Sequence, residues 1–139
     1  MDQQTVEAKM AAQVDQAHRS AMTRVFAWEF ETVGLVVYVI MRPRKQPNRS
    51  HLLRVSFDDF PRRAPSYVFV HPTSRELTDD AWPPNVKHSD PLPGICTPGT
   101  REFHEKYHAG DAQYPWSEER YSFLDTLQRI HALVEHGLP

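Results

Sequence analysis

The sequence has one cysteine in 139 residues, no long hydrophobic run and no strong net charge. One cysteine cannot form a disulfide within the chain, which fits a reducing compartment and leaves Cys96 free for packing, metal binding or catalysis. The longest apolar run, residues 34–41, is far shorter than the roughly 20 residues that span a bilayer, and no signal-peptide pattern opens the chain. A net charge of -2 disfavours nucleic acid as the main partner. These absences predict a cytoplasmic protein with no membrane or nucleic-acid partner.

Composition predicts one folded domain over residues 1–139. Hydrophobic residues make up 40% of the chain and charged residues 24%, which is near the average for soluble globular proteins and argues against disorder. The length allows a real core but is too short for two ordinary domains.

Apolar periodicity predicts a helix followed by four strands. One helical stripe over about residues 4–24 carries Val6, Met10, Val14, Ala17, Ala21 and Val25. The segments 26–32, 35–41, 51–57 and 67–70 are rich in β-branched or aromatic residues and indicate an antiparallel meander. The basic segment 42–49 is interpreted as a solvated hairpin loop, since no aromatic residues interleave its charges as they do in a nucleic-acid patch.

Regular structure becomes sparse after Val70, and all 12 prolines except Pro139 lie between Pro43 and Pro115. Loops this long in a compact domain are usually functional. A last helix is predicted from Ser117, a good N-cap, to Gly137. Its apolar face would carry Tyr121, Leu124, Leu127, Ile130 and Val134. The predicted fold class is therefore α+β, with an N-terminal helix, a four-stranded sheet, a long irregular segment and a C-terminal helix that covers the sheet.

Two candidate chemistries fall within residues 91–119. A lone cysteine is more often a small buried hydrophobe than a nucleophile, but Cys96 lies among loop-forming residues, P-G-I before it and T-P-G after it, which leaves a reactive thiol open. The string His104-Glu105-Lys106-Tyr107-His108 matches H-E-x-x-H, in which two histidines on one helix can share a zinc ion. Pro98-Gly99 and Gly110 leave room for a short helix only, so a solvated helical turn is the favoured interpretation of this string.

Three ordered motifs resemble the ubiquitin-conjugating enzyme family. Residues 51–70, HLLRVSFDDFPRRAPSYVFV, are similar to the family's third strand, F-P-x-x-x-P turn and fourth strand. Residues 82–96, WPPNVKHSDPLPGIC, resemble its H-P-N…G-x-I-C stretch, and residues 115–134 resemble its W-S-P segment and the helix that follows. The resemblance covers about residues 4–136.

The sequence departs from the family in four ways. Pro83 replaces the motif histidine, the gap from Asn85 to Cys96 is longer, an extra stretch separates Cys96 from Trp116, and the sequence stops after the tail helix. A shortened form of this kind resembles bacterial members that are encoded with ubiquitin-like modifiers and activating enzymes, and antiviral defence is one role that this implies.

The resemblance implies a UBC-like fold and an enzyme that needs no cofactor. Cys96 would accept a ubiquitin-like modifier as a thioester from an activating enzyme and pass it to a lysine amine of a target protein. Asn85 would donate its amide N–H to the oxyanion or brace the loop. His88 would replace the missing histidine or lower the pKa of the thiol. The extra stretch offers three acids that could orient or deprotonate the amine, namely Glu102, Glu105 and Asp111.

Two alternatives remain open. The first is an inactive protein of the same fold that only binds a ubiquitin-like protein, against which the presence of Gly94-Ile95-Cys96 argues. The second is a zinc protein that uses His104 and His108, either with Cys96 and His88 in a structural site or in a hydrolytic one. A zinc ion on the Cys96 sulfur would be incompatible with acyl carriage.

Overall fold

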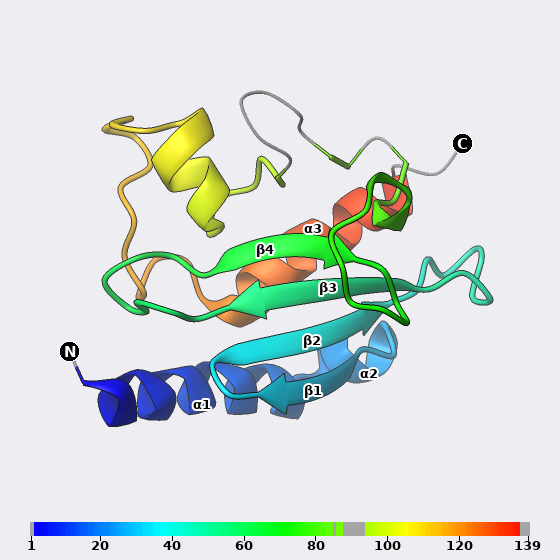
Figure 1. Cartoon of the computed structure of the whole chain (residues 1–139), viewed down its shortest axis with the longest axis horizontal. Helices are drawn as coiled ribbons and strands as arrows, with labels where there is room; N and C mark the ends of the chain where they lie inside the picture. Colours follow the sequence, from blue (N-terminus) through cyan, green and yellow to red (C-terminus); the bar gives the residue numbers. More distant parts are fainter. Residues whose placement is uncertain (1, 85, 88–93, 137–139) are drawn as a thin grey trace.

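The computed structural model describes residues 2–84, 86–87 and 94–136, and it has the predicted α+β arrangement. Four strands form one sheet, and α1 (Gln3–Arg19) and α3 (Phe123–His136) pack side by side on one of its faces, as Figure 1 shows. The core lies between this face and the two helices. No helix within the described ranges is long and apolar enough to cross a membrane.

The sheet is an antiparallel meander in the order β1-β2-β3-β4, which confirms the predicted topology. Its strands are β1 (Glu29–Val33), β2 (Val36–Met41), β3 (His51–Ser56) and β4 (Ser66–Val70). The core face is built in register, with Val37 opposite Val55 and Val55 opposite Tyr67, all fully buried. The predicted first strand began too early, because Ala27 has a positive φ of 54° and turns the chain before Glu29.

The predicted N-terminal helix is interrupted at Ser20. This residue has extended backbone angles, and its Oγ accepts a hydrogen bond from the backbone N–H of Met22, so it ends α1 and caps α2 (Ala21–Val25). The break rotates the following residues away from the core. Ala21 and Val25 are exposed, and their assignment to the buried stripe was therefore wrong.

The C-terminal helix begins at Phe123 rather than just after Ser117. Ser117 instead stabilises a preceding turn, in which its Oγ accepts from the backbone N–H of Arg120. The backbone N–H of Phe123 donates to Gln13 of α1 at 2.9 Å, which ties the start of α3 to the first helix. Phe123 then lies at the centre of the core, its ring centroid 5.5 Å from that of Phe57.

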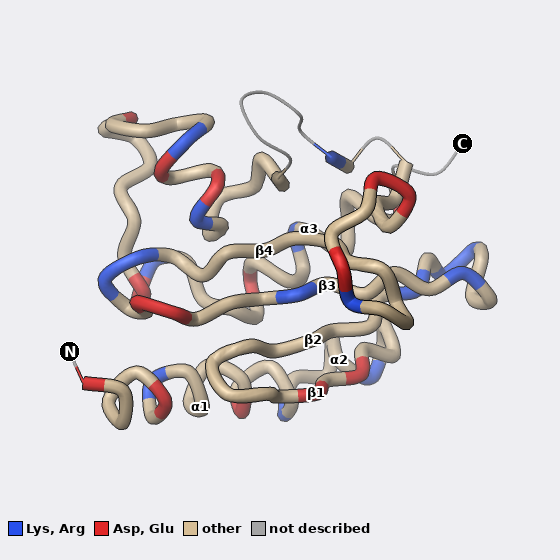
Figure 2. Tube along the Cα trace, in the orientation of Figure 1, with Lys and Arg blue, Asp and Glu red and all other residues tan. Residues whose placement is uncertain are grey.

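The other face of the sheet is partly covered by residues 71–82, which pass in front of β3 and β4 in Figure 1 and include η1 (Asp79–Ala81). The Arg75 guanidinium lies 4.1 Å from the centre of the Tyr38 ring and pairs with Glu31 of β1. The basic loop between β2 and β3 projects from the end of the sheet (Figure 2), and residues 44–50 are exposed, as predicted.

Candidate functional site

Cys96 lies on a loop beyond the edge of β4, and its side chain is partly exposed as a free thiol. The residues on either side, Ile95 and Thr97, are buried and fix the course of the loop. Burial raises the pKa of the Cys96 thiol above its ordinary value. None of the hydrogen bonds among the described residues involves the Cys96 sulfur, and the raised pKa favours the neutral thiol.

Two glycines hold the loop against different parts of the molecule. A Cβ on Gly94 would lie 2.8 Å from both Glu102 Cγ and the Tyr107 hydroxyl. A Cβ on Gly99 would lie 2.1 Å from Thr126 Oγ1 of α3, and Gly99 also has a positive φ of 103°. Cys96 therefore lies between two closely packed glycines, of which Gly99 tolerates no side chain without a shift of its surroundings.

Thr100 closes the turn that follows Cys96. Its buried hydroxyl lies 2.9 Å from the carbonyl oxygens of both Ile95 and Thr97, and it accepts a hydrogen bond from the backbone N–H of Phe103 at 3.1 Å. This last contact is an N-cap, and it starts a short helix over residues 101–107. The helix widens into the π-helical η2 (Phe103–Tyr107), as the hydrogen bond from His108 N to Phe103 O shows.

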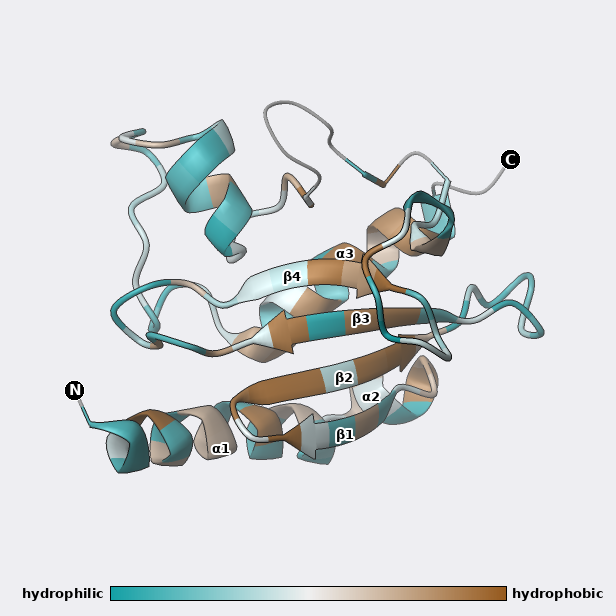
Figure 3. Ribbon diagram, in the orientation of Figure 1, coloured by the Kyte–Doolittle hydropathy of each residue, from teal (hydrophilic) through white to brown (hydrophobic). Residues whose placement is uncertain are grey.

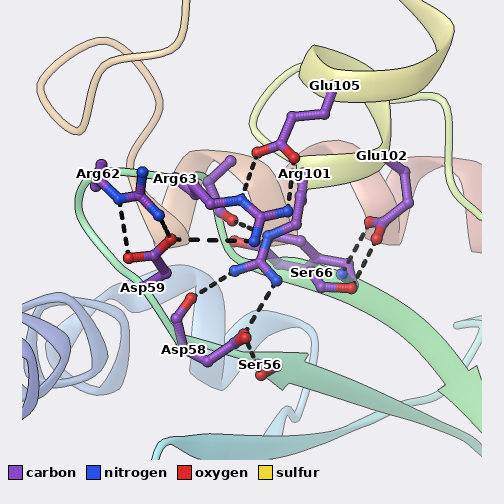
Figure 4. Close-up of polar contacts among 11 residues, drawn as sticks. Ser56, Asp58, Asp59, Arg62, Arg63, Ser66, Arg101, Glu102 and Glu105 are labelled. Atoms are coloured by element: carbon purple, nitrogen blue, oxygen red, sulfur yellow. Dashed lines mark hydrogen bonds and ion pairs between the residues drawn. The ribbon is translucent and has the colours of Figure 1, made fainter.

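Charged side chains attach this helix to the turn between β3 and β4, as Figure 4 shows. Arg63 of the F-P-R-R-A-P turn binds both carboxylate oxygens of Glu105, at 2.9 and 2.6 Å. Arg101 donates to the carbonyl oxygens of Ala64 and Asp58 and pairs with the Asp58 carboxylate at 3.0 Å. We call residues 97–116 the post-cysteine segment; these contacts fix its first half beside the sheet.

The three predicted acids are all engaged. Glu102 is buried and accepts from the Ser66 hydroxyl at 2.6 Å and from the backbone N–H of Tyr67 at 3.1 Å. Hydrogen bonds from Arg63 lower the pKa of Glu105. The backbone N–H of Gln113 lowers the pKa of Asp111. Glu105 and Asp111 are thus weak bases, which argues against their use in deprotonating an amine.

A groove of about 390 Å³ lies beside the Gly94 contact. It is bounded by β4, residues 77–82 and the 101–107 helix, and its walls include Val68, Leu77, Trp82, Glu102 and Lys106. Mostly apolar walls with a few charged groups can take an apolar ligand or the side chains of an extended peptide.

His104 uses both ring nitrogens. Nε2 accepts from the backbone N–H of Gly99 at 3.0 Å, and Nδ1 lies 2.9 Å from the carbonyl oxygen of Tyr114. His108 pairs instead with Asp111, Nδ1 to Oδ2 at 3.3 Å. A zinc ion on His104 would have to displace one of its two backbone partners. The described residues contain no group of three His, Cys, Asp or Glu side chains placed to hold a metal ion.

Asn85 and His88, the other two candidate catalytic residues, lie outside the described residues. Of the predicted site, the structure therefore places Cys96 and the post-cysteine acids. It does not bring His108 to the Cys96 loop, whereas His104 reaches that loop through Gly99.

Sequence reasoning missed Thr100 and Arg101, which organise the loop. Thr100 could have been found, since threonine is a favoured N-cap residue and an acid in the first turn, here Glu102, is typical of a helix start. Arg101 has no comparable signal, because its partners Asp58 and Ala64 lie in another part of the chain.

No protein-family model matches the chain, and no curated protein matches it.

Proposed function

We propose that this protein is a conjugating enzyme of the ubiquitin-conjugating type, in which Cys96 carries a ubiquitin-like modifier as a thioester. The observation that carries the proposal is the position of the three family-like motifs within the fold. The F-P-R-R-A-P turn joins β3 to β4, G-I-C opens the loop beyond β4, and W-S precedes the helix that covers the sheet. Three motifs at the three matching places of a four-strand meander support the proposal more strongly than any one motif.

The setting of Cys96 supports acyl carriage. A nucleophile that exchanges groups with two large proteins must be reachable yet fixed, and Cys96 is partly exposed on a loop held by Gly94 and Gly99. A cysteine used only for packing would be expected in the core, among residues such as Leu53 and Leu127.

The chemistry consists of two acyl exchanges. The Cys96 thiolate attacks the carbonyl carbon of the thioester between modifier and activating enzyme, a new S–C bond forms, and the activating enzyme's thiolate leaves. A lysine amine then attacks the same carbonyl carbon, an amide bond forms, and the Cys96 thiolate leaves while the amine proton passes to a base or to solvent. On the resemblance, Asn85 would stabilise the oxyanion in both steps and His88 would assist the thiol.

Among the described residues no charged group activates the Cys96 thiol, since burial is the one cause that shifts its pKa and it raises that pKa. A cysteine hydrolase needs the opposite, a thiolate stabilised by a nearby histidine or other cation.

The groove beside Gly94 is the proposed path of the modifier's C-terminal tail. It runs along the edge of β4, where an extended tail could lie with apolar side chains against Val68 and Trp82. The buried Glu102 carboxylate is part of this wall and holds β4 in place through Tyr67.

The proposal is tested by charging the protein. Incubation with a purified ubiquitin-like modifier, its activating enzyme and ATP should give an adduct that dithiothreitol cleaves. Cys96→Ser should give either no adduct or an oxyester that resists dithiothreitol and is cleaved by hydroxide. The proposal is wrong if the activating enzyme becomes charged with the modifier and the wild-type protein does not.

A further inference from the structure

The His104 ring links the Cys96 loop to both ends of the post-cysteine segment. Its Nε2 faces the backbone N–H of Gly99, and its Nδ1 faces the carbonyl oxygen of Tyr114. A backbone N–H can only donate and a carbonyl oxygen can only accept. The two partners therefore fix the protonation of the ring: Nδ1 carries a proton, Nε2 carries a lone pair, and the imidazole is neutral.

Gly99 is the point at which this link reaches the loop. It lies three residues after Cys96 and packs against Thr126 of α3, so the hydrogen bond to His104 attaches the same peptide to the 101–107 helix. The His104 ring packs beside the stacked rings of Trp116 and Tyr121, whose centroids lie 5.7 and 4.7 Å from its own. Gly99 is thus contacted by α3 on one side and by the His104 imidazole on the other.

We infer that His104 is a positioning residue for Cys96: the neutral imidazole fixes the end of the Cys96 loop, and protonation of the imidazole releases it. The inference rests on the proposed function for its catalytic consequence, since the position of Cys96 matters to the rate of acyl transfer. It assigns the H-E-x-x-H string a role in which His104 binds two backbone groups rather than a metal.

Protonation breaks the link for a simple reason. An imidazolium has a proton on Nε2, which would point at the N–H proton of Gly99, and two donors cannot share a hydrogen bond. Burial is the main cause that lowers the pKa of His104, while the Tyr114 carbonyl raises it. The link is therefore intact at neutral pH and is lost as the pH falls below about 6.5, the ordinary value for histidine.

The charged and titratable groups around the ring come from four parts of the chain. The F-P-R-R-A-P turn contributes two cations, Arg62 and Arg63. The 101–107 helix contributes Glu105, and the residue after it is His108. The turn before α3 contributes Arg120 and Tyr121, and Tyr114 comes from the end of the post-cysteine segment. Glu105 forms an ion pair with Arg63. His108, when it is protonated, forms an ion pair with Asp111. Arg120 has no ion pair among the described residues, and its charge opposes protonation of His104.

Two conservative variants of His104 separate its contact with Gly99 from its contact with Tyr114. In His104→Gln the side-chain oxygen can take the place of Nε2 and accept from Gly99, but it does not titrate. In His104→Asn the side-chain amide can take the place of Nδ1 and donate to Tyr114, but nothing reaches Gly99. His108→Gln is the matched control, because it alters the residue that follows the same helix, whose ring nitrogen pairs with Asp111 and not with the Cys96 loop.

The first measurement follows the Gly99 amide by ¹H–¹⁵N NMR and does not depend on the proposed function. In the wild type its chemical shift should titrate in a single step below pH 6.5. That step should disappear in His104→Gln. In His104→Asn the amide should exchange with solvent at least about tenfold faster at pH 7. A Gly99 shift that is independent of pH, or exchange in His104→Asn equal to that of wild type, would overturn the inference.

The second measurement is the rate of thioester transfer from Cys96 to free lysine across pH 5.5 to 8. His104→Asn should lower kcat roughly tenfold to a hundredfold with little change in KM, whereas His104→Gln and His108→Gln should keep the wild-type rate at pH 7. The extra fall in rate below pH 6.5 should be present in wild type and absent in His104→Gln. Equal rates in wild type and His104→Asn would overturn the inference, as would stoichiometric zinc that His104→Asn removes. If the wild type forms no thioester at all, the proposed function fails while the Gly99 titration still decides the link.

Discussion

The two parts of the molecule that meet at Cys96 are held together by different forces. The sheet and its helices form a core of fully buried apolar and aromatic side chains, among them Leu53, Phe57, Leu127 and Ile130. The 101–107 helix is mostly hydrophilic, as Figure 3 shows, and is attached to the sheet by ion pairs and hydrogen bonds to backbone groups. Only Phe103 is a fully apolar buried side chain within that helix.

This difference separates stability from the geometry of the site. Burial of apolar area supplies most of the folding free energy and depends little on salt. Ion pairs that are a third or more exposed, such as Arg63–Glu105, contribute little and weaken with salt. Changes in pH or salt should therefore shift the Cys96 loop before they unfold the domain.

The largest expected effect is on the core. Leu127→Asp places a charge among fully buried side chains and should lower the free energy of unfolding by at least about 4 kcal/mol. Leu133→Asp on the exposed side of the same helix should cost less than about 1 kcal/mol. Denaturant unfolding followed by circular dichroism measures both values. Equal losses in the two variants would discredit the placement of α3 on the sheet.

The contact between the loop and α3 should be next in size. Gly99→Ala places a Cβ against Thr126 at a residue with positive φ, and it should lower the free energy of unfolding by about 3 kcal/mol. Gly110→Ala is a matched control, since Gly110 also has a positive φ but meets no atom within 4 Å. Gly110→Ala should lower the free energy of unfolding by about 1 kcal/mol. A thermal unfolding series that ranks the two variants the other way would contradict the described course of the loop.

Acid should weaken the core through a buried histidine. His131 is fully buried, accepts from Trp28 Nε1 at 2.9 Å, and has a pKa that burial lowers. The unfolded chain then binds a proton that the folded protein does not, so stability falls as the pH drops below about 6.5, with a limiting slope near 1.4 kcal/mol per pH unit. Carboxylates whose pKa values are lowered, such as Glu105, add their own loss only at more acidic pH.

The pH dependence is checked by measuring the free energy of unfolding between pH 5 and 7. His131→Asn keeps an acceptor for Trp28 and removes the titration, so its curve should be flatter than that of wild type. Curves of equal slope would show that His131 does not contribute.

The smallest effect is expected from single surface charges. Arg63→Ala removes the pair with Glu105 and should lower global stability by less than about 1 kcal/mol, yet it should speed hydrogen exchange in residues 101–108. Arg44→Ala should change neither the global stability nor the hydrogen exchange of residues 101–108. The hydrogen bond of Arg44 to Glu135 comes from its backbone N–H, which the substitution keeps. Hydrogen exchange is measured by mass spectrometry. If residues 101–108 were as protected in Arg63→Ala as in wild type, the 101–107 helix would not be held to the sheet by this ion pair.

The order of the elements was predictable, because helical and strand periodicity are local properties of the sequence. The boundaries at Ser20, Ala27 and Phe123 were not, since each depends on a cap or a turn that overrides the apolar pattern. The candidate nucleophile was found from the residues around it. The roles of Arg101 and His104 could not be found, because their partners are backbone groups that only the folded chain brings near.

The central claim is that Cys96 carries an acyl group and passes it to an amine. The most direct measurement is a pulse-chase: charge the protein with a purified ubiquitin-like modifier and its activating enzyme, remove ATP, add free lysine and follow the intact mass. The account predicts that the thioester mass is lost and a modifier–lysine product appears at a matching rate, and that Cys96→Ala never acquires the mass. An adduct that forms equally on Cys96→Ala, or that never passes to lysine, would contradict it.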